Sequence, residues 1–309
     1  MRIIQIALFG LLVMGGLVSC NQSAVDPVEA ESEAFTKNID DIKSYATTKG
    51  LSLSTTASGL HYVITAPASA TAKQPVIGEE IEFSYVQYIL QSPTSGTGVV
   101  TDKVVDTTYA TKSVYYPFVN NSLLAGLQEG ILLMREGASA TLLMPARLAY
   151  GSQGSVSGTI PANTPVRFDV KLKRSRSEDQ QISEYITRTN LGTPEVTSSG
   201  LRFIRTSSPT STTFAPGATL AVRYNGRLLR SVAAFDSTSG TTTRDFTLGN
   251  SSIIKGFEEG LAKLKVGEKA TLIFPSSLGY GAAGRAANGV YVIPPGAPLR
   301  FDVEVVSVR

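Results

Sequence analysis

Few residues of this chain belong to types that commonly perform covalent catalysis or bind metals. Its 309 residues include one histidine, His61, and one cysteine, Cys20. Neither stands at a spacing typical of a Ser-His-Asp triad, a Cys-His pair or a zinc site, so we expect no metal and no cofactor. Any chemistry must therefore come from shape, apolar walls and a few dipoles. The stretch 253–306 is the best candidate, because it combines apolar, aromatic, glycine-rich and Pro-Pro segments.

The stretch 253–306 also contains the elements needed to position such walls. Residues 253–261 form a short apolar segment with helical spacing, and residues 299–305 alternate charged and apolar side chains. Alternation predicts a strand with one buried and one solvated face, which is typical of an antiparallel sheet. A single helix packed across such a sheet gives an α+β domain.

Much of the chain repeats. Several blocks of the first half return in the second half in the same order, which chance does not plausibly produce. The matched blocks are 78–85 with 216–224, 123–130 with 253–260, 135–142 with 265–272, 148–151 with 278–281, 160–161 with 293–294, and 166–170 with 299–303. The sequence therefore predicts two copies of one α+β domain.

Each copy is preceded by apolar residues at helical spacing, within 35–46 and 182–186, which predict a helix ahead of each sheet. We place the first domain at 35–176 and the second at 177–309. The charged run 171–179 is interpreted as a solvated strand end and linker rather than a binding patch. The net charge of +3 includes no long Lys/Arg run, so nucleic acid is not an expected partner.

The amino terminus has the pattern of an export signal. Met1-Arg2 is followed by a predominantly apolar run, residues 3–18, that is short for a membrane span. The sequence 17–20, Leu-Val-Ser-Cys, resembles the bacterial lipobox. We predict a signal peptide at 1–19, and a lipidated Cys20 with a flexible tether at 20–34. The alternative is an ordinary signal peptide cleaved nearby.

Both copies resemble the FKBP-type peptidyl-prolyl isomerases, strongly in the second copy and partially in the first. The resemblance implies an antiparallel half-barrel wrapped on a short helix, with a proline pocket between them. In the second copy the implied pocket residues are Tyr224, Phe235, Asp236, Ile253, Ile254, Phe257, Tyr280, Ile293 and Phe301. In the first copy the same positions are Tyr85, Val105, Asp106, Leu123, Leu124, Leu127, Tyr150, Ile160 and Phe168.

The resemblance also implies a reaction that needs no proton transfer. A site that binds the twisted X-Pro amide more tightly than either planar isomer lowers the barrier to rotation. In the second copy the Ile254 N–H and the Tyr280 hydroxyl would hold substrate carbonyls, while Asp236 would orient Tyr224 or the rim. The expected protein is an envelope lipoprotein, anchored in the outer membrane facing the periplasm, that helps proline-containing polypeptides to fold.

Some positions depart from the family pattern. Phe257 replaces the usual Trp, Arg244 stands where an aromatic is usual with Phe246 nearby, and the loop 284–291 is long. In the first copy two aromatic walls are aliphatic, and Val86-Gln87 replaces Asn-Gly. We therefore expect catalysis mainly in the second copy. The alternatives are a non-catalytic peptide-binding or chaperone module using the same clefts, and a structural part of a surface machine.

Overall fold

The computed structural model describes residues 27–93, 98–108, 112–207, 214–215, 217–250 and 252–309. The predicted signal peptide, Cys20 and the first part of the tether lie outside these ranges. The chain divides into two compact units between Ser175 and Arg176, with Gly78–Glu80 grouped with the second unit. We call these units domain 1 and domain 2, and each is described by itself.

Domain 1 is built on a seven-stranded sheet with the order β1-β2-β6-β7-β3-β4, in which β5 also pairs with β3. The pairs β2 with β6, β6 with β7 and β3 with β4 are antiparallel. The elements are α1 (Pro27–Lys49), β1 (Ser54–Thr55), β2 (His61–Ala66), β3 (Glu79–Gln91), β4 (Thr101–Thr107), β5 (Val114–Phe118), α2 (Ala125–Leu132), β6 (Ser139–Met144), the 3-10 turn η1 (Ala146–Leu148) and β7 (Val166–Arg176).

Domain 2 repeats this plan in a sheet with the order β11-β10-β16-β13-β9-β8, in which β12 also pairs with β10. A separate two-stranded sheet, β14-β15, forms from the long loop 284–291 and the two residues that follow it. The elements are α3 (Glu178–Thr189), β8 (Glu195–Val196), β9 (Arg202–Arg205), β10 (Thr219–Leu228), β11 (Ala234–Ser237), β12 (Arg244–Thr247), α4 (Lys255–Ala262), β13 (Lys269–Phe274), η2 (Ser276–Leu278), β14 (Arg285–Ala287), β15 (Val290–Ile293) and β16 (Leu299–Val308).

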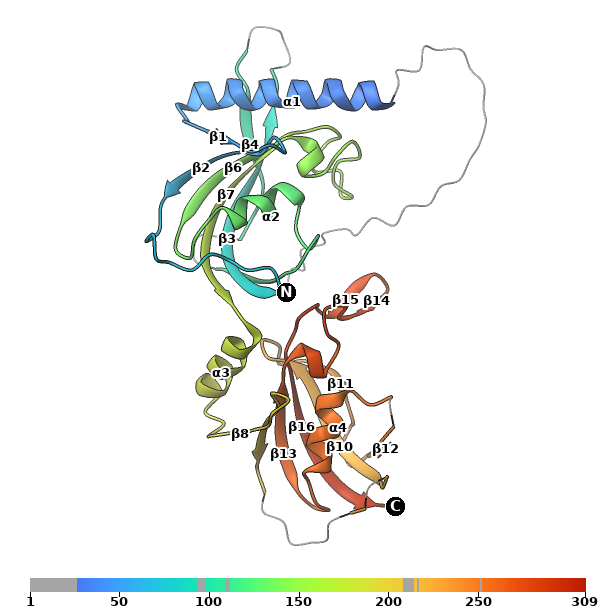
Figure 1. Cartoon of the computed structure of the whole chain (residues 1–309). Coiled ribbons are helices and arrows are strands. Elements are labelled where there is room, and N and C mark those ends of the chain that lie inside the picture. The colour runs from blue at the N-terminus through green and yellow to red at the C-terminus, as the bar shows by residue number, and fades with distance from the viewer. Residues whose placement is uncertain (1–26, 94–97, 109–111, 208–213, 216, 251) are drawn as a thin grey trace, which may run out of the picture. The chain divides into compact units, whose positions relative to one another are not determined.

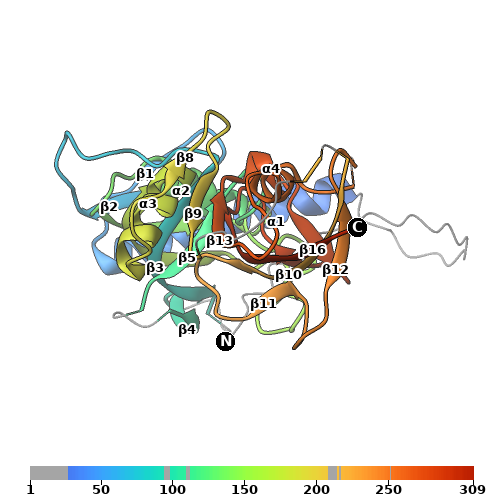
Figure 2. The same ribbon diagram turned by 90° about the horizontal axis from the view of Figure 1, so that it is seen from below.

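The two sheets have the same topology, since β8, β9, β13, β16, β10 and β11 occupy the places of β1, β2, β6, β7, β3 and β4. In each domain one short helix, α2 or α4, lies across the sheet (Figures 1 and 2). The prediction of two copies of an α+β domain with antiparallel sheets is therefore confirmed.

Glycines allow α4 to lie close to its sheet. A Cβ on Gly256 would lie 2.5 Å from the Phe274 ring, and a Cβ on Gly260 would lie 2.3 Å from a Leu272 methyl carbon. Gly126 and Gly130 make the same approach to the sheet in domain 1. The spacing of four residues places both glycines of each pair on the sheet-facing side of the helix.

The helices that precede the sheets cover the opposite sheet face. In domain 2, Ile182 and Tyr185 of α3 pack on Ile273, whereas the neighbouring Leu272 and Phe274 belong to the core under α4. A capping box between Ser177 and Gln180 starts α3. In domain 1, Ile42 and Tyr45 of α1 pack in the same way on Leu143.

Equivalent polar contacts hold α3 and α1 to the rest of their domains. Glu178 of α3 accepts hydrogen bonds from the Ser276 N–H at 2.5 Å and from the Ser276 hydroxyl at 2.8 Å. Arg300 donates to the Tyr185 hydroxyl at 2.7 Å. In domain 1 the corresponding contacts join Asn38 to the Ala146 N–H, at 2.7 Å, and Arg167 to the Tyr45 hydroxyl.

Two sequence interpretations differ from the structure. Helix α1 begins at Pro27, so residues 27–34, predicted as tether, are helical; proline is favoured at the first helical position. The predicted solvated strand end is buried in part, since Ser175 is 2% and Arg176 4% exposed. Arg176 forms ion pairs with Glu80 and Glu184, at 2.8 and 3.0 Å, which explains how a charge is tolerated there. Within the described ranges no helix is long and apolar enough to cross a bilayer.

Candidate functional site

Aromatic side chains from several strands and from α4 converge on one face of the domain 2 sheet. Tyr224 lies on β10, Phe235 on β11, Phe246 on β12, Phe257 on α4 and Phe301 on β16. The Phe257 ring centroid lies 4.9 Å from that of Phe301 and 5.0 Å from that of Phe246. The contacts are tilted or edge-to-face, which is the favoured geometry for aromatic pairs.

This cluster has a buried floor and a partly exposed rim. Phe257, Phe301 and Tyr224 are only 3%, 4% and 6% exposed, and we call them the floor. Phe235 and Tyr280 are partly buried against the same core, and with Ile254 they form the rim. Because the floor rings pack against one another, a ligand would contact the partly exposed rim residues first.

Two hydrogen-bond donors lie at this rim. Ile254 is the N-cap of α4, and Tyr280 follows η2, where the Gly281 N–H donates to Ser276 O at 2.8 Å. Among the described residues, neither the Ile254 N–H nor the Tyr280 hydroxyl forms a hydrogen bond. The first N–H groups of a helix have no partner within the helix, so such a donor is available to a ligand carbonyl.

Two charged residues, Arg244 and Asp236, lie beside Tyr224 of the floor. Arg244 donates to the Tyr224 hydroxyl at 3.2 Å and lies 3.8 Å from the Asp236 carboxylate. Burial, together with hydrogen bonding to Asp236, raises the pKa of Tyr224, although Arg244 acts in the opposite direction. Tyr224 therefore stays neutral at physiological pH.

The structure brings the residues predicted for the second copy together. Tyr224, Phe257, Ile293 and Phe301 are buried in one core, with Phe235, Ile253, Ile254 and Tyr280 packed against it. Asp236 follows Phe235 on β11.

Sequence reasoning left two contributors out of the predicted site. Phe246 was noted only as a neighbour of Arg244, and its ring lies in the cluster. Phe274, which is fully buried, stacks against Phe301 at 5.8 Å. Phe246 lies between exposed residues of β12 and Phe274 ends the buried run of β13, so no alternating pattern marked either residue.

Domain 1 places its predicted residues in an equivalent core with different walls. Tyr85, Leu123, Leu127, Ile160 and Phe168 are buried there, and Val105, Leu124 and Tyr150 pack against them. The Tyr85 hydroxyl donates to Asp106 at 2.6 Å.

Gln87 changes the rim of domain 1. It stands where domain 2 has Gly226, is 4% exposed, and its amide donates to the Tyr150 hydroxyl at 2.9 Å. In domain 2 a Cβ on Gly226 would lie 2.5 Å from the Phe301 ring, so that position has no room for a side chain. The Tyr150 hydroxyl of domain 1 thus accepts a hydrogen bond from within the protein, unlike the Tyr280 hydroxyl of domain 2.

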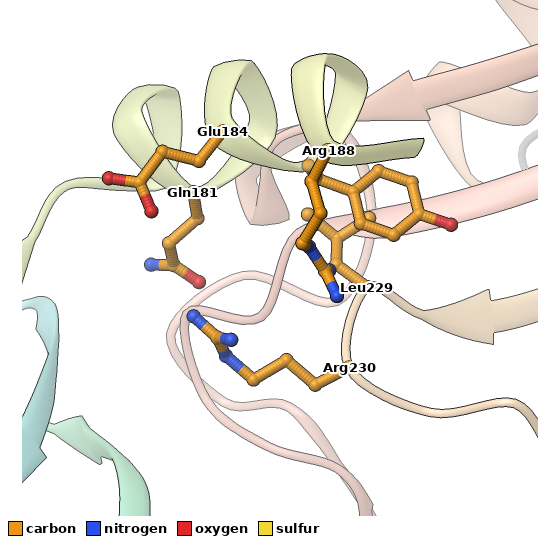
Figure 3. Close-up of a pocket in the computed structure, with 6 residues that line it drawn as sticks. Gln181, Glu184, Arg188, Leu229 and Arg230 are labelled. Atoms are coloured by element: carbon orange, nitrogen blue, oxygen red, sulfur yellow. The ribbon is translucent and has the colours of Figure 1, made fainter. Parts of the chain in front are cut away.

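Two hollows lie outside the aromatic cluster. A hollow of about 400 Å³ lies beside α2 in domain 1 and includes Leu123 and Leu124 among its lining residues, with Gln128 and Leu132. A hollow of about 30 Å³ lies beside α3 in domain 2, between Glu184, Arg188 and Arg230 (Figure 3). The second has room for about one water molecule and contains none of the predicted site residues.

His61 is 5% exposed, and its Nδ1 lies 3.0 Å from Gly59 O. Among the described residues no group of three or more His, Cys, Asp or Glu side chains is placed to hold a metal ion.

Comparisons with known proteins point to one family. The chain matches the family model described as FKBP-type peptidyl-prolyl cis-trans isomerase over residues 72–173 and 210–306. The isomerase FPR2 of Saccharomyces cerevisiae is 46% identical over 95 residues, 30% of this chain and 67% of that protein. FKBP53 of Arabidopsis thaliana is 42% identical over 94 residues, 30% of this chain and 19% of that protein.

Longer matches have lower identity. FKBP9 of Rattus norvegicus is 30% identical over 207 residues, 66% of this chain and 32% of that protein. The crystal structure of the three FKBP domains of wheat FKBP73 aligns with 82% of this chain and 96% of that chain, at 17% identity and a TM-score of 0.36. The chain thus spans 19% of FKBP53 and 32% of FKBP9. Since the family model matches both halves of the repeat, the chain belongs to the FKBP-type peptidyl-prolyl cis-trans isomerase family and contains two tandem domains of that type.

Proposed function

We propose that this protein catalyses cis–trans isomerisation of X-Pro bonds in polypeptides, and that domain 2 carries the activity. One observation carries the proposal: the unengaged Ile254 N–H and Tyr280 hydroxyl lie at the rim of the same aromatic floor. Donors beside an apolar surface can hold substrate carbonyls while the proline ring contacts the aromatic side chains.

The chemistry suits a site without an acid, base or nucleophile. Rotation about the X-Pro bond is slow because the conjugated amide imposes a barrier of about 18–20 kcal/mol. Water stabilises the planar, charge-separated amide, so apolar walls such as Phe235 and Phe257 favour the twisted form. Binding that is stronger for the twisted amide than for either planar isomer accelerates the reaction. Tyr224, kept neutral by its raised pKa, shapes the floor without transferring a proton.

Domain 1 supports a second candidate function, the binding of polypeptide segments without catalysis. Gln87 engages the Tyr150 hydroxyl, and the walls at Val105 and Leu127 are aliphatic. The hollow of about 400 Å³ beside α2 offers apolar surface at Leu124 and Leu132. Capture of an unfolded client by a variant with an inactivated domain 2 would favour this role.

The test is a proline-isomerisation assay on residues 27–309 and on variants of each domain. We expect Phe235→Ala and Tyr280→Phe to lower kcat/KM on an X-Pro peptide strongly. The corresponding changes Val105→Ala and Tyr150→Phe in domain 1 should have little effect. Unchanged activity in both domain 2 variants would reject the assignment of catalysis to domain 2.

We also propose that the protein is a lipoprotein of the cell envelope, anchored through Cys20 in the outer membrane and facing the periplasm. The support is the lipobox-like sequence 17–20 after a short apolar run. A lipid chain contributes about 0.8 kcal/mol per buried CH₂, so several chains on one residue anchor a protein stably. Labelled palmitate should be incorporated into the wild-type chain and not into Cys20→Ser, and equal labelling of both would contradict the anchor.

A further inference from the structure

Arg285 lies against the rim of the domain 2 site. Its guanidinium lies 5.4 Å from the Tyr280 ring centroid and 5.6 Å from that of Phe235. Both rings belong to the rim, where they are partly buried against the core of domain 2. Because Arg285 is only partly buried, its charge is accessible to a bound peptide.

The backbone fixes Arg285 in this position. The Gly284 N–H donates to Tyr280 O at 3.1 Å, and Gly284 has a φ of +63°, which favours glycine. A Cβ on Gly284 would also lie 2.5 Å from Ile293 O. Arg285 then pairs with Ile293 across the β14–β15 hairpin, directly opposite a residue of the predicted site. The turn therefore holds the arginine beside the rim.

The described part of the chain does not balance the charge of Arg285. No carboxylate of the described residues lies within 4.0 Å of its guanidinium, and its polar contact is a long one, 3.5 Å, to Phe235 O. Arg244, the other arginine at the site, lies 3.8 Å from Asp236. The rim of domain 2 thus has an excess of positive charge.

Domain 1 provides an internal comparison. Gly154 has the same turn as Gly284, with a φ of +71° and a hypothetical Cβ 2.3 Å from Ile160 O. The next residue is Ser155, whose hydroxyl accepts a hydrogen bond from the Ile160 N–H at 2.8 Å. The same backbone position therefore carries a neutral, internally bonded side chain in domain 1 and an unpaired cation in domain 2.

We propose that Arg285 gives the site of domain 2 a preference for substrates with a carboxylate side chain on a residue next to the proline. The inference rests on the proposed isomerase function. A guanidinium donates two parallel hydrogen bonds to a carboxylate in a planar contact, and the Arg285 guanidinium lies near the Tyr280 and Phe235 rings of the rim. The preference concerns the charge of the substrate, whereas the aromatic floor acts on the proline itself.

The test compares peptides that differ only in charge. One set has Glu, Gln or Lys before the proline, and a second set has them after it. At low ionic strength we expect kcat/KM of residues 27–309 to be about three- to fivefold higher for Glu than for Gln in one of the sets, the effect of one exposed ion pair, and lower for Lys. At about 1 M salt, where screening acts over about 3 Å, the ratio should approach one.

Variants separate the role of the charge from general effects. Arg285→Gln should remove the Glu-over-Gln preference while the Gln peptide is still turned over, and Arg285→Glu should make Lys the favoured residue. Arg188→Gln is the matched control, because it removes an arginine that lies 5.5 Å from the Tyr185 ring on the opposite face of the sheet. This control should keep the wild-type preference.

The outcomes distinguish the two proposals. Turnover of the Gln peptides with a Glu-to-Gln ratio of one in both sets overturns the role of Arg285 and leaves the isomerase function standing. Absence of turnover for every peptide rejects the isomerase function. In that case the ratio of peptide Kd values for Glu and Gln, and its loss in Arg285→Gln, still decides whether Arg285 recognises a carboxylate.

Discussion

Gly226 provides a direct steric test of the domain 2 site. A Cβ at this position would lie 2.5 Å from one carbon of the Phe301 ring and 3.1 Å from the Phe235 ring. Ordinary van der Waals contacts begin at 3.4 Å. In Gly226→Ala the Phe301 ring would therefore have to move by about 0.9 Å, the difference between 3.4 and 2.5 Å. It cannot retreat freely, because the fully buried Phe274 stacks behind it at 5.8 Å.

The expected consequences follow from this displacement. Overpacking of a well-packed core typically costs about 1–3 kcal/mol of stability, and the urea midpoint of domain 2 should fall accordingly. A misplacement of about 1 Å can cost about a hundredfold in rate, so we expect kcat/KM on an X-Pro peptide to fall at least about tenfold.

A control on the same strand separates these effects from a general response to mutation. Asn225 follows Tyr224 on the opposite face of β10, and its side-chain oxygen is buried with no hydrogen-bond partner among the residues that the structure describes. Asn225→Ala should therefore keep both stability and kcat/KM close to wild type. Full activity of a folded Gly226→Ala would refute the assignment of the floor as the proline site.

The other predictions concern domain 1 and the preceding helices. In a Phe235→Ala background, Gln87→Gly should raise residual isomerase activity, because it releases the Tyr150 hydroxyl; no change would show that Gln87 does not limit domain 1. Ile182→Ala should lower the stability of domain 2 by about 2–5 kcal/mol in urea unfolding, as expected for a fully buried isoleucine, whereas the exposed Thr187→Ala should not. Burial raises the pKa of Tyr45 to about 12, so the neutral hydroxyl contributes stability that is present below about pH 10 and lost as the pH rises toward 12. Unfolding measured from pH 8 to 11 should show this loss in the wild type and a smaller loss in Tyr45→Phe, in which Tyr85, Tyr150 and Tyr224 keep their raised pKa values.

The sequence predicted the fold well because the relevant signals are local or repeated. Alternation along 299–305 identified the faces of β16, and the matched blocks predicted two sheets of one topology. The β14–β15 hairpin was not foreseen, since its residues, such as Arg285 and Ala286, lack a long alternating pattern. The start of α1 at Pro27 was also missed, because small and acidic residues around it suggested a tether although they are compatible with a helix.

The composition of the site was predictable only in part. Tyr224, Phe257 and Phe301 fall within blocks that match the family, so their convergence follows from the fold. The effect of Gln87 depends on Tyr150, which is 63 residues away, and spacing along the chain gives no indication of that hydrogen bond. The position of Arg285 over two rings likewise depends on a turn whose geometry the sequence alone did not specify.

The helices α1 and α3 have a practical consequence for work on separated domains. Asn38 and Tyr45 hold the first helix in the same manner as Glu178 and Tyr185 hold the second, so the repeated structural unit includes a helix as well as a sheet. A recombinant fragment that starts after residue 190 would leave Ile273 and its neighbours in contact with solvent and would be prone to aggregate. Expression of the carboxyl-terminal half should therefore start at or before Ser177.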